Sequence, residues 1–421
     1  MTHTPWLKTH GTHLGCEAAP SQTEHLSVGV VGTYPPRICG IATFTQDLVH
    51  ALRQQHSPAL VQVAAMTRSP DCLAYPPEVA VQIRQESLDD YAAAARALNE
   101  ASDVVCLQHE FGIFGGHDGE LVTELMTRMT VPIVTTFHTI LHEPSTAQRA
   151  VLRRVAKLSW RVVVMSETAR LFLIDLYGVS PEAVCVIPHG VPAQPFGDTA
   201  AAKSELGLSN RKVVLTFGLL SANKGIEVML RGLPEVIRSH PDVLYIVLGK
   251  GHPLAMTDGR ETYVARLKRL ASELGLDRNV AFESRFVELD ELCVYLRSAD
   301  VYVTPYSNEE QITSGTLSFA MGSGIASVST PYWYAREMLA DGRGRLVPFG
   351  DARALGSAVS DLLSDDLARN DIRSRAYEFS RAAVWQNVGA RYLRLFEQAL
   401  GTNFAGLPDS TSTKEAMATI A

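Results

Sequence analysis

The sequence lacks the features that mark several large classes of protein. No apolar run approaches the roughly 20 residues that cross a bilayer, and the N-terminal stretch MTHTPWLKTHGTHLG has no signal-peptide core. The net charge of −7 argues against nucleic acid as the main partner, because phosphate binding needs a basic surface. Six scattered cysteines without a C-x-x-C pair favour reduced thiols in a cytoplasmic protein over a disulfide framework or a zinc site.

The composition that is present predicts a soluble, globular chain. The chain is 46% apolar and 20% charged, as is typical of such proteins. Its length of 421 residues suits two or three domains. We expect residues 1–26 to form a flexible N-terminal tail and residues 404–421 to form a flexible C-terminal tail.

The first half of the chain alternates between strand and helix patterns. Ser27–Gly32 is a compact apolar strand, a loop rich in turn formers follows, and Ile41–Leu52 continues as a helix. Further elements follow at α/β spacing, with strands at Leu60–Ala65, Val104–Leu107, Val131–Thr135, Val162–Met165 and Val184–Ile187, and helices at Leu88–Asn99, Glu120–Met129, Arg149–Leu158 and Thr168–Leu176. The pattern predicts a doubly wound parallel sheet with helices on both faces. No G-x-G-x-x-G follows the first strand, which argues against a generic Rossmann dehydrogenase.

Polar residues follow these predicted strands, at the sheet edge where doubly wound domains bind their ligands. Three of them are histidines, His109, His138 and His189. A single histidine at such a place is usually structural, but three at equivalent strand ends favour a site.

The second half repeats the alternation. Residues 193–210 have no strong periodicity and read as an interdomain linker. The later strands are predicted at Val213–Phe217, Val243–Leu248 and Val280–Phe282, and the helices at Ile226–Ile237, Glu261–Leu274, Leu289–Leu296, Asp351–Leu363 and 371–400. The chain should therefore hold two Rossmann-like, doubly wound parallel-sheet domains that face each other across a cleft.

The stretch Tyr302–Glu337 carries the strongest local signal. It reads as strand, loop, helix, strand, loop and helix, with a buried strand at Val301–Thr304 and a helix that opens at Ser314 and Gly315. The unpaired N–H groups and the dipole of a helix start make it a ready anion site. The alternative is an ordinary strand-to-helix turn with a hydroxyl cap.

Motifs from both halves, taken together, resemble the family 4 retaining glycosyltransferases with the GT-B fold. In chain order they are TYPPRICGIATF, TTFHT, VMSETA, VIPHGV, FGLLSANKG, VLGKGHP, SADVYVTPY and SGTLSFAMGSGIASVSTPYWYAREML. The resemblance covers about residues 27–400. It implies an acceptor domain at 27–195, a nucleotide-sugar domain at 196–380, and a terminal helix at 381–403 that crosses back to the first domain.

The resemblance also implies a function. It is the transfer of a hexose, mannose or glucose, from GDP-mannose or UDP-glucose to a carbohydrate or glycoside acceptor, without cofactor or metal. No D-x-D triplet occurs, so a metal-held diphosphate is not expected. Lys224 and Gly225, at a predicted helix start, would hold the diphosphate with Gly40 and Gly218 of the glycine-containing loops.

Some family positions differ in this chain. The usual arginine five residues before Lys224 is Leu219, and Arg37 or Lys250 are candidates to replace it. The family's pair of glutamates falls on Gln311 and Phe319. We expect Glu309 and Glu310 to supply a catalytic carboxylate in their place. The remaining donor contacts are assigned to Gln311, Ser314, Gly315, Thr316 and, near the nucleotide, Glu337 and His252.

Other roles follow from the first domain. His138 matches the family histidine that contacts the donor sugar, and Arg37, His109 and Glu110 are the candidate acceptor-binding residues. Two alternatives stay open: a GT-B glycosyl phosphorylase, which needs no base pocket, and a non-catalytic carbohydrate- or nucleotide-binding protein. The basic residues Arg149, Arg153, Arg154, Lys157 and Arg161 suggest a membrane-surface contact less strongly than a solvated helix face.

Overall fold

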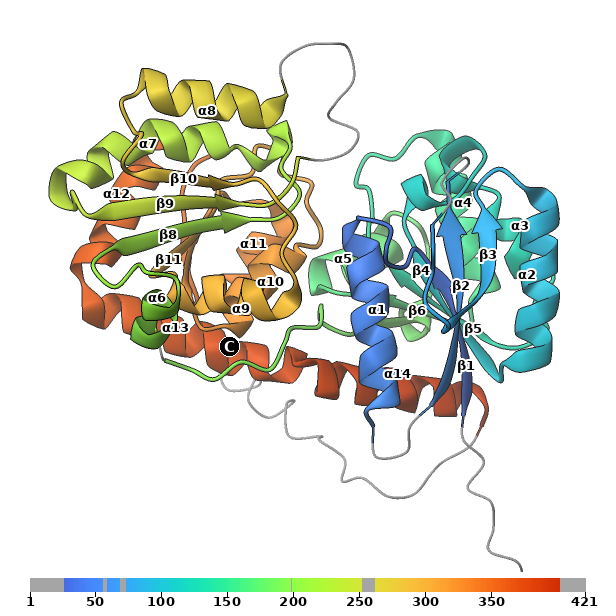
Figure 1. The fold of residues 1–421 in the computed structure, drawn as a ribbon. Helices are drawn as coiled ribbons and strands as arrows, with labels where there is room; N and C mark the ends of the chain where they lie inside the picture. The colour runs from blue at the N-terminus through green and yellow to red at the C-terminus, as the bar shows by residue number, and fades with distance from the viewer. Residues whose placement is uncertain (1–25, 56–58, 69–72, 198, 252–261, 402–421) are drawn as a thin grey trace, which may run out of the picture.

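The computed structural model describes residues 26–55, 59–68, 73–197, 199–251 and 262–401, and shows two α/β domains side by side (Figure 1). The first holds a seven-stranded parallel sheet in the order β3-β2-β1-β4-β5-β6-β7, and the second a six-stranded parallel sheet in the order β10-β9-β8-β11-β12-β13. The expected pair of doubly wound domains is therefore confirmed. The two predicted tails lie outside the described residues, apart from residue 26.

The first sheet is built from β1 (Ser27–Gly32), β2 (Leu60–Thr67), β3 (Val79–Arg84), β4 (Val104–His109), β5 (Ile133–Phe137), β6 (Arg161–Val164) and β7 (Val184–Val186). Its helices are α1 (Gly40–Arg53), α2 (Leu88–Ala101), α3 (Val122–Met126), α4 (Thr146–Leu158) and α5 (Glu167–Asp175). All residues of β4 and β5 are buried, because helices cover both faces of a parallel sheet and leave neither face exposed to solvent.

The second sheet is built from β8 (Lys212–Phe217), β9 (Val243–Leu248), β10 (Val280–Glu283), β11 (Val301–Thr304), β12 (Ala326–Ser329) and β13 (Arg345–Leu346). Its helices are α6 (Thr199–Glu205), α7 (Ile226–Ser239), α8 (Tyr263–Glu273), α9 (Leu289–Ser298), α10 (Gly315–Gly322), α11 (Trp333–Met338), α12 (Ala352–Ser364) and α13 (Asp366–Ser380). In Figure 1, α10 and α11 lie on the side of this domain that faces the first domain.

The last helix, α14 (Trp385–Ala399), returns from the second domain and runs beneath the first (Figure 1). Its apolar side belongs to the core of the first domain, where Trp385, Tyr392 and Phe396 pack with Phe44 and Leu48 of α1. The predicted helix over 371–400 is therefore two helices. A 3-10 turn at Arg381–Ala383 and the extended Val384, with φ −62° and ψ 143°, separate them.

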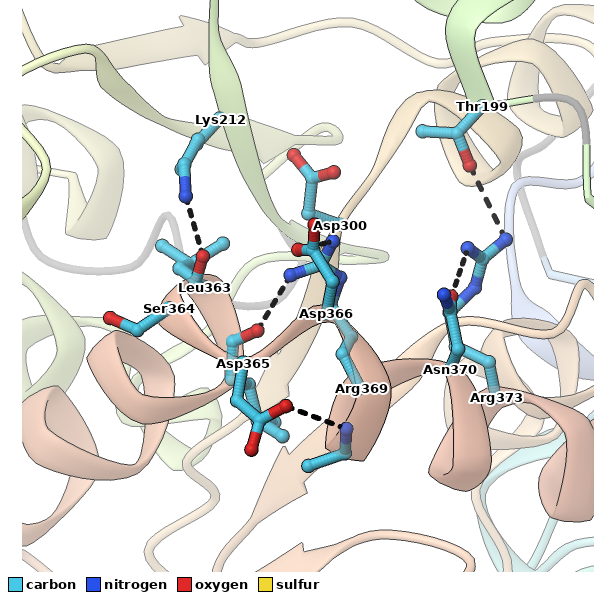
Figure 2. Close-up of polar contacts among 12 residues, drawn as sticks. Thr199, Lys212, Asp300, Leu363, Ser364, Asp365, Asp366, Arg369, Asn370 and Arg373 are labelled. Atoms are coloured by element: carbon cyan, nitrogen blue, oxygen red, sulfur yellow. Dashed lines mark hydrogen bonds and ion pairs between the residues drawn. The ribbon is translucent and has the colours of Figure 1, made fainter.

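The segment read as a linker contains α6, which polar contacts fix to the second domain. Lys203 Nζ lies 2.6 Å from Asp300 Oδ2, and the same oxygen accepts from the backbone N–H of Val213 at 2.6 Å. Figure 2 shows the neighbouring contacts: Arg373 of α13 reaches Thr199 at the start of α6, and Lys212 reaches the Leu363 carbonyl. Because these bonds span sequence-distant elements, local periodicity could not reveal them.

Two simple properties complete the description. The four cysteines in the described part of the chain, Cys39, Cys106, Cys185 and Cys293, are free thiols, and Cys106 and Cys293 are buried. In the described residues, no helix has both the length and the apolar character needed to cross a membrane.

Candidate active site

The centre of the candidate site is the amino end of α10. The strand β11 ends at Thr304, and the chain then runs through a loop that is exposed over residues 307–310. It reaches Ser314, whose hydroxyl caps the helix by accepting from the Leu317 N–H at 3.4 Å. The first N–H groups of a helix have no partner within it, so those of Gly315 and Thr316 remain to face a ligand. The helix dipole makes an anion the favoured ligand.

Lys224, the predicted phosphate cation, lies beside this helix end. Its Nζ donates to the Tyr306 hydroxyl at 2.9 Å and lies 4.1 Å from the centroid of that ring. The Tyr306 hydroxyl in turn lies 2.9 Å from Thr316 Oγ1, which lies 3.3 Å from Ser314 Oγ. Burial opposes ionisation of Tyr306, but the Lys224 ammonium and these hydrogen bonds lower the pKa of Tyr306 below its ordinary value. The arrangement brings one cation, three hydroxyls and a helix start together.

Two glycines allow these elements to approach one another. Gly225 has φ 59°, and a Cβ there would lie 2.0 Å from the Pro305 carbonyl oxygen. Gly218 has φ 129°, and its Cβ would lie 3.1 Å from Thr316 Cγ2. A larger residue at position 225 would collide with the backbone that follows β11, which is a packing reason for glycine there.

His138, at the end of β5, is held by a residue that the sequence did not single out. Its Nε2 lies 2.9 Å from Gln108 Oε1, and the Gln108 amide nitrogen donates to Cys106 Sγ at 3.2 Å. Since Oε1 can only accept, Nε2 carries the proton and Nδ1 keeps its lone pair. Burial, and then the rings of His189 and His109, lower the pKa of His138 to about 3, so the ring is neutral near pH 7.

His189 belongs to the same site, although sequence reasoning gave it no individual role. Its Nδ1 lies 2.8 Å from the Gly190 carbonyl oxygen. Its Nε2 lies 2.7 Å from where a Cβ on Gly315 would be, so the ring lies against the first residue of α10. Phe44 contacts the rings of both His138 and His189, at 4.8 and 5.1 Å between centroids. The sequence feature that pointed to His189 was its position in the motif PHG, just after a predicted strand.

His109 and Glu110 are placed differently from the acceptor-binding expectation. His109 is fully buried among Phe111, Phe114 and Phe137, with no hydrogen-bond partner on either ring nitrogen. Successive side chains of β4 point to opposite faces of the sheet, so Gln108 faces His138 while His109 faces the core. The His109 side chain is therefore not accessible to an acceptor in this structure. Glu110 accepts from Thr139 Oγ1 at 2.5 Å and from the Phe111 N–H at 3.0 Å, and burial raises its pKa.

The acidic candidates on the loop before α10 are exposed. Glu309 forms an ion pair with Arg336 at 2.5 Å, and both side chains are about half exposed. Glu310 is exposed, and its backbone N–H donates to Asn308 Oδ1. The Gln311 amide donates to the Thr313 carbonyl at 2.6 Å, within the same loop. Glu309 therefore contacts helix α11 and Gln311 contacts its own loop, and their assigned roles remain predictions.

Glu337 is the clearest departure from expectation, because it binds the first domain instead of standing free for a nucleotide. Its carboxylate accepts from the N–H groups of Glu167 and Thr168 at 2.8 and 3.0 Å and from Thr168 Oγ1 at 2.8 Å. These are the first residues of α5. A carboxylate suits that place because the helix dipole and the unpaired N–H groups both favour a negative charge.

Aromatic rings strengthen this contact between the domains. Trp333 of α11 lies 4.9 Å from Phe172 of α5 and 5.5 Å from His142, measured between ring centroids. The Ser166 hydroxyl, which caps α5, also donates to the Ile312 carbonyl of the second domain at 3.3 Å. The loop before α10 and helix α11 are therefore both fixed to the first domain.

Arg37, Gly40 and Lys250 are the other predicted site residues that the structure describes. Arg37 donates to the Met66 carbonyl at 3.1 Å. Gly40 is exposed, at the start of α1, and no atom lies within 4 Å of a Cβ built on it. Lys250 is exposed and follows β9, beside the loop that carries Leu219. His252 lies outside the described residues. Within the described ranges, no three His, Cys, Asp or Glu side chains gather as metal ligands.

Two residues of the basic helix face have structural partners. Arg149 donates to the Leu176 carbonyl at 2.6 Å, and Arg153 donates to the Tyr177 carbonyl at 2.9 Å. They thereby satisfy carbonyl groups just beyond the end of α5, where cations are favoured by the helix dipole.

Two family models match the chain. Residues 38–194 match Glycosyltransferase Family 4, and residues 211–365 match Glycosyl transferases group 1. A phosphatidyl-myo-inositol mannosyltransferase of Mycolicibacterium smegmatis is 29% identical over 273 residues, 64% of this chain and 66% of that protein. A D-inositol 3-phosphate glycosyltransferase of Acidothermus cellulolyticus is 29% identical over 299 residues, 67% of this chain and 65% of that protein. The match thus spans just under two thirds of either relative.

Solved structures show the same fold at lower identity. HepE of Anabaena, in complex with UDP and glucose, superposes with a TM-score of 0.68 and 18% identity, over 89% of this chain and 100% of that chain. Sucrose-phosphate synthase of Thermosynechococcus elongatus gives a TM-score of 0.72 and 18% identity, over 90% of this chain and 100% of that chain.

Proposed function

This chain belongs to the family 4 glycosyltransferases with the GT-B fold, and we propose that it is a retaining hexosyltransferase. The proposed donor is a nucleoside-diphosphate sugar carrying mannose or glucose, and the proposed acceptor is a sugar or glycoside in the cytoplasm. The observation that carries this proposal is the convergence of Lys224, the hydroxyls of Tyr306 and Thr316, and the amino end of α10.

The chemistry of the transfer explains why that arrangement matters. When the acceptor oxygen bonds to the anomeric carbon, the bond from that carbon to the diphosphate breaks and negative charge grows on the leaving oxygen. A fixed ammonium and helix N–H groups stabilise that charge without reorganising during the reaction. We propose that they do so in place of a divalent metal ion.

The proton of the acceptor also needs a destination. In a retaining transfer on this fold, a phosphate oxygen of the leaving group takes the acceptor proton on the face from which it departs, so no enzymic nucleophile is required. The protein then contributes positioning. His138 suits this task, because Gln108 fixes its protonated Nε2 and leaves the Nδ1 lone pair to accept from a donor sugar hydroxyl.

The relatives narrow the choice of substrates. The relatives from Mycolicibacterium smegmatis and Acidothermus cellulolyticus are both named for the transfer of a sugar to an inositol-containing acceptor. The name of the first specifies a mannosyl group. The HepE structure holds UDP and glucose. These names favour GDP-mannose or UDP-glucose as the first donors to test, and a phosphorylated polyol or a glycoside as the acceptor.

One observation favours a second candidate, a glycosyl phosphorylase. Phe319 stands where the resemblance implies the second glutamate of the family, which would hold the nucleotide ribose. It is 6% exposed and packs against His189. Glu337 cannot take over while it caps α5. A phosphorylase needs a sugar-phosphate site and no base pocket, so phosphorolysis of a disaccharide with inorganic phosphate would distinguish the two.

A thermal-shift panel of GDP, UDP, ADP and their sugars tests the donor proposal. We expect one nucleotide and its sugar to raise the melting temperature, and Lys224→Ala to abolish that rise while the unliganded protein still unfolds cooperatively. Lys157→Ala, at an exposed lysine of α4, is the matched control and should keep the shift. A full shift in Lys224→Ala would remove the basis of the proposal.

His138→Ala tests the positioning role separately. The variant should bind the donor nearly as well as the wild type, because Lys224 and the amino end of α10 lie on the second domain and are unchanged. Its kcat should fall by about 100-fold, the scale of a lost orienting contact. Wild-type kcat in this variant would contradict the role given to His138.

A further inference from the structure

The proposed diphosphate site is short of positive charge. A nucleoside-diphosphate sugar carries two negative phosphate charges, and Lys224 is the cation that the structure places at α10. Leu219 stands where the family resemblance implies an arginine, and Arg37 is bonded to the Met66 carbonyl. A second group that can become positive is therefore needed near Gly315.

His189 presents such a group from the opposite domain. The Gly190 carbonyl can only accept, so the Nδ1 atom that lies 2.8 Å from it carries a hydrogen. In the neutral ring the lone pair is then on Nε2, the atom that lies against Gly315. Any Cβ at position 315 would collide with it at 2.7 Å. The ring nitrogen left unused by the fold thus faces the first turn of α10.

A lone pair at this position would repel a phosphate oxygen, whereas a protonated Nε2 would donate to it and add a charge. We infer that His189 is a further ligand of the donor diphosphate, that it binds as the imidazolium, and that donor binding takes up a proton. The inference rests on the proposed function, because it needs a diphosphate at α10.

The surroundings of His189 are compatible with this change of charge. Phe44 of α1, Trp385 of α14 and Phe319 of α10 contact the ring, and none of them titrates. Among the residues that the structure describes, the titratable neighbour that senses it is His138, whose pKa it lowers. A charge on one of these two rings therefore opposes a charge on the other.

The direction of the pH effect follows. Burial lowers the pKa of His189 to about 4, against the opposing effect of the Gly190 carbonyl, so the ring of the free protein is neutral near pH 7. Two nearby phosphate charges raise that pKa on binding. The complex then holds one proton more than the free protein, and affinity must fall as the pH rises between the free and the bound pKa.

Calorimetric titration with UDP-glucose and with GDP-mannose, from about pH 5.5 to 7.5, tests this linkage. The diphosphate of either sugar is a diester and does not titrate there, so the pH dependence belongs to the protein. We expect wild-type affinity to fall about tenfold over the range, with proton uptake visible as a buffer-dependent binding enthalpy.

His189→Asn is the decisive variant. Its side-chain amide can still donate to the Gly190 carbonyl, but it has no titratable group. It should bind about tenfold more weakly at about pH 5.5 and show no pH dependence. His189→Gln provides a second test if the Asn variant is unfolded by circular dichroism. His50→Asn, at an exposed histidine of α1, is the control and should behave as wild type.

The outcomes separate this inference from the proposed function. A pH dependence that persists in His189→Asn, or that disappears in His138→Asn or Lys250→Ala instead, overturns the role of His189. Binding that is tight and pH-independent in the wild type overturns it as well, while leaving the donor proposal intact. If wild-type protein binds neither nucleotide sugar at any pH, both fail together.

Discussion

The contact of Glu337 with helix α5 offers a sharp test of how the two domains are held. Both carboxylate oxygens are used: one accepts from the Glu167 N–H at 2.8 Å, and the other accepts from the N–H and the hydroxyl of Thr168 at 3.0 and 2.8 Å. Glu337→Gln removes the charge and turns one acceptor into a donor that faces an N–H group.

The magnitude can be worked from these bonds. A charged hydrogen bond contributes about 1.5–3 kcal/mol and a carboxylate at a helix start about 0.3–2 kcal/mol, and these estimates overlap because they describe the same contact. Glu337 is half-buried, so water screens part of the interaction. We therefore expect Glu337→Gln to lower the free energy of unfolding by about 1–2 kcal/mol.

Amide hydrogen exchange is the most direct assay, because Glu337 is the partner of two identified N–H groups. Exchange at Glu167 and Thr168 should accelerate about tenfold in Glu337→Gln, which corresponds to about 1.4 kcal/mol. A double-mutant cycle with Thr168→Val should give a coupling energy of about 1 kcal/mol. Glu205→Gln, at an exposed glutamate of α6, is the control. Unchanged exchange at both amides would show that the contact does not hold in solution.

Three further changes test the packing described above. His109→Leu should stabilise the protein by about 1–2 kcal/mol, because the buried imidazole has no hydrogen-bond partner; no gain in urea denaturation would contradict this. Burial lowers the pKa of His109 to about 3. As the pH falls below about 6.5, His109 therefore gains a proton in the unfolded chain but stays neutral in the folded chain, which lowers the free energy of unfolding. The variant lacks this group, so it should also lose less stability between about pH 6.5 and 4. Gly190→Ala should cost about 2–3 kcal/mol, since its Cβ would lie 2.4 Å from the Trp385 ring; a wild-type melting temperature would refute the close approach. Lys203→Met should cost about 3 kcal/mol by leaving the Asp300 carboxylate without its cation, both side chains being only 12% exposed; Lys157→Met is the control, and equal stability of the two variants would mean that the ion pair contributes nothing.

The order of strands and helices was largely readable from the chain. Continuous apolar runs such as Val104–Leu107 and Val213–Phe217 became buried central strands, because a parallel sheet covered on both faces imposes one local rule along its length. The edge strand β3 does not follow this pattern and was not predicted. Its residues alternate between half-buried and exposed, and only Ile83 is fully buried. The two-residue β13 and the short helix α6 were also missed, since their stability comes from distant partners.

The candidate site was readable only where a motif combined with local geometry. Lys224, Ser314, Gly315 and Thr316 lie together, and the glycine turn and the hydroxyl cap that place them are each encoded within a few residues. Gln108 and His189 act across the sheet and across the domain junction, so no local pattern assigned them.

Taken by itself, the sequence determined the alternation of elements, the two-domain layout and the helix start that can receive an anion, since each depends on residues that are neighbours in the chain. The tertiary structure decided which charged groups remain available to a ligand. Glu337 is bound to α5, Glu309 is paired with Arg336, and His189 is turned toward α10. Those assignments depend on distances between groups separated by tens to hundreds of residues, and such distances exist only after the two sheets have packed against each other.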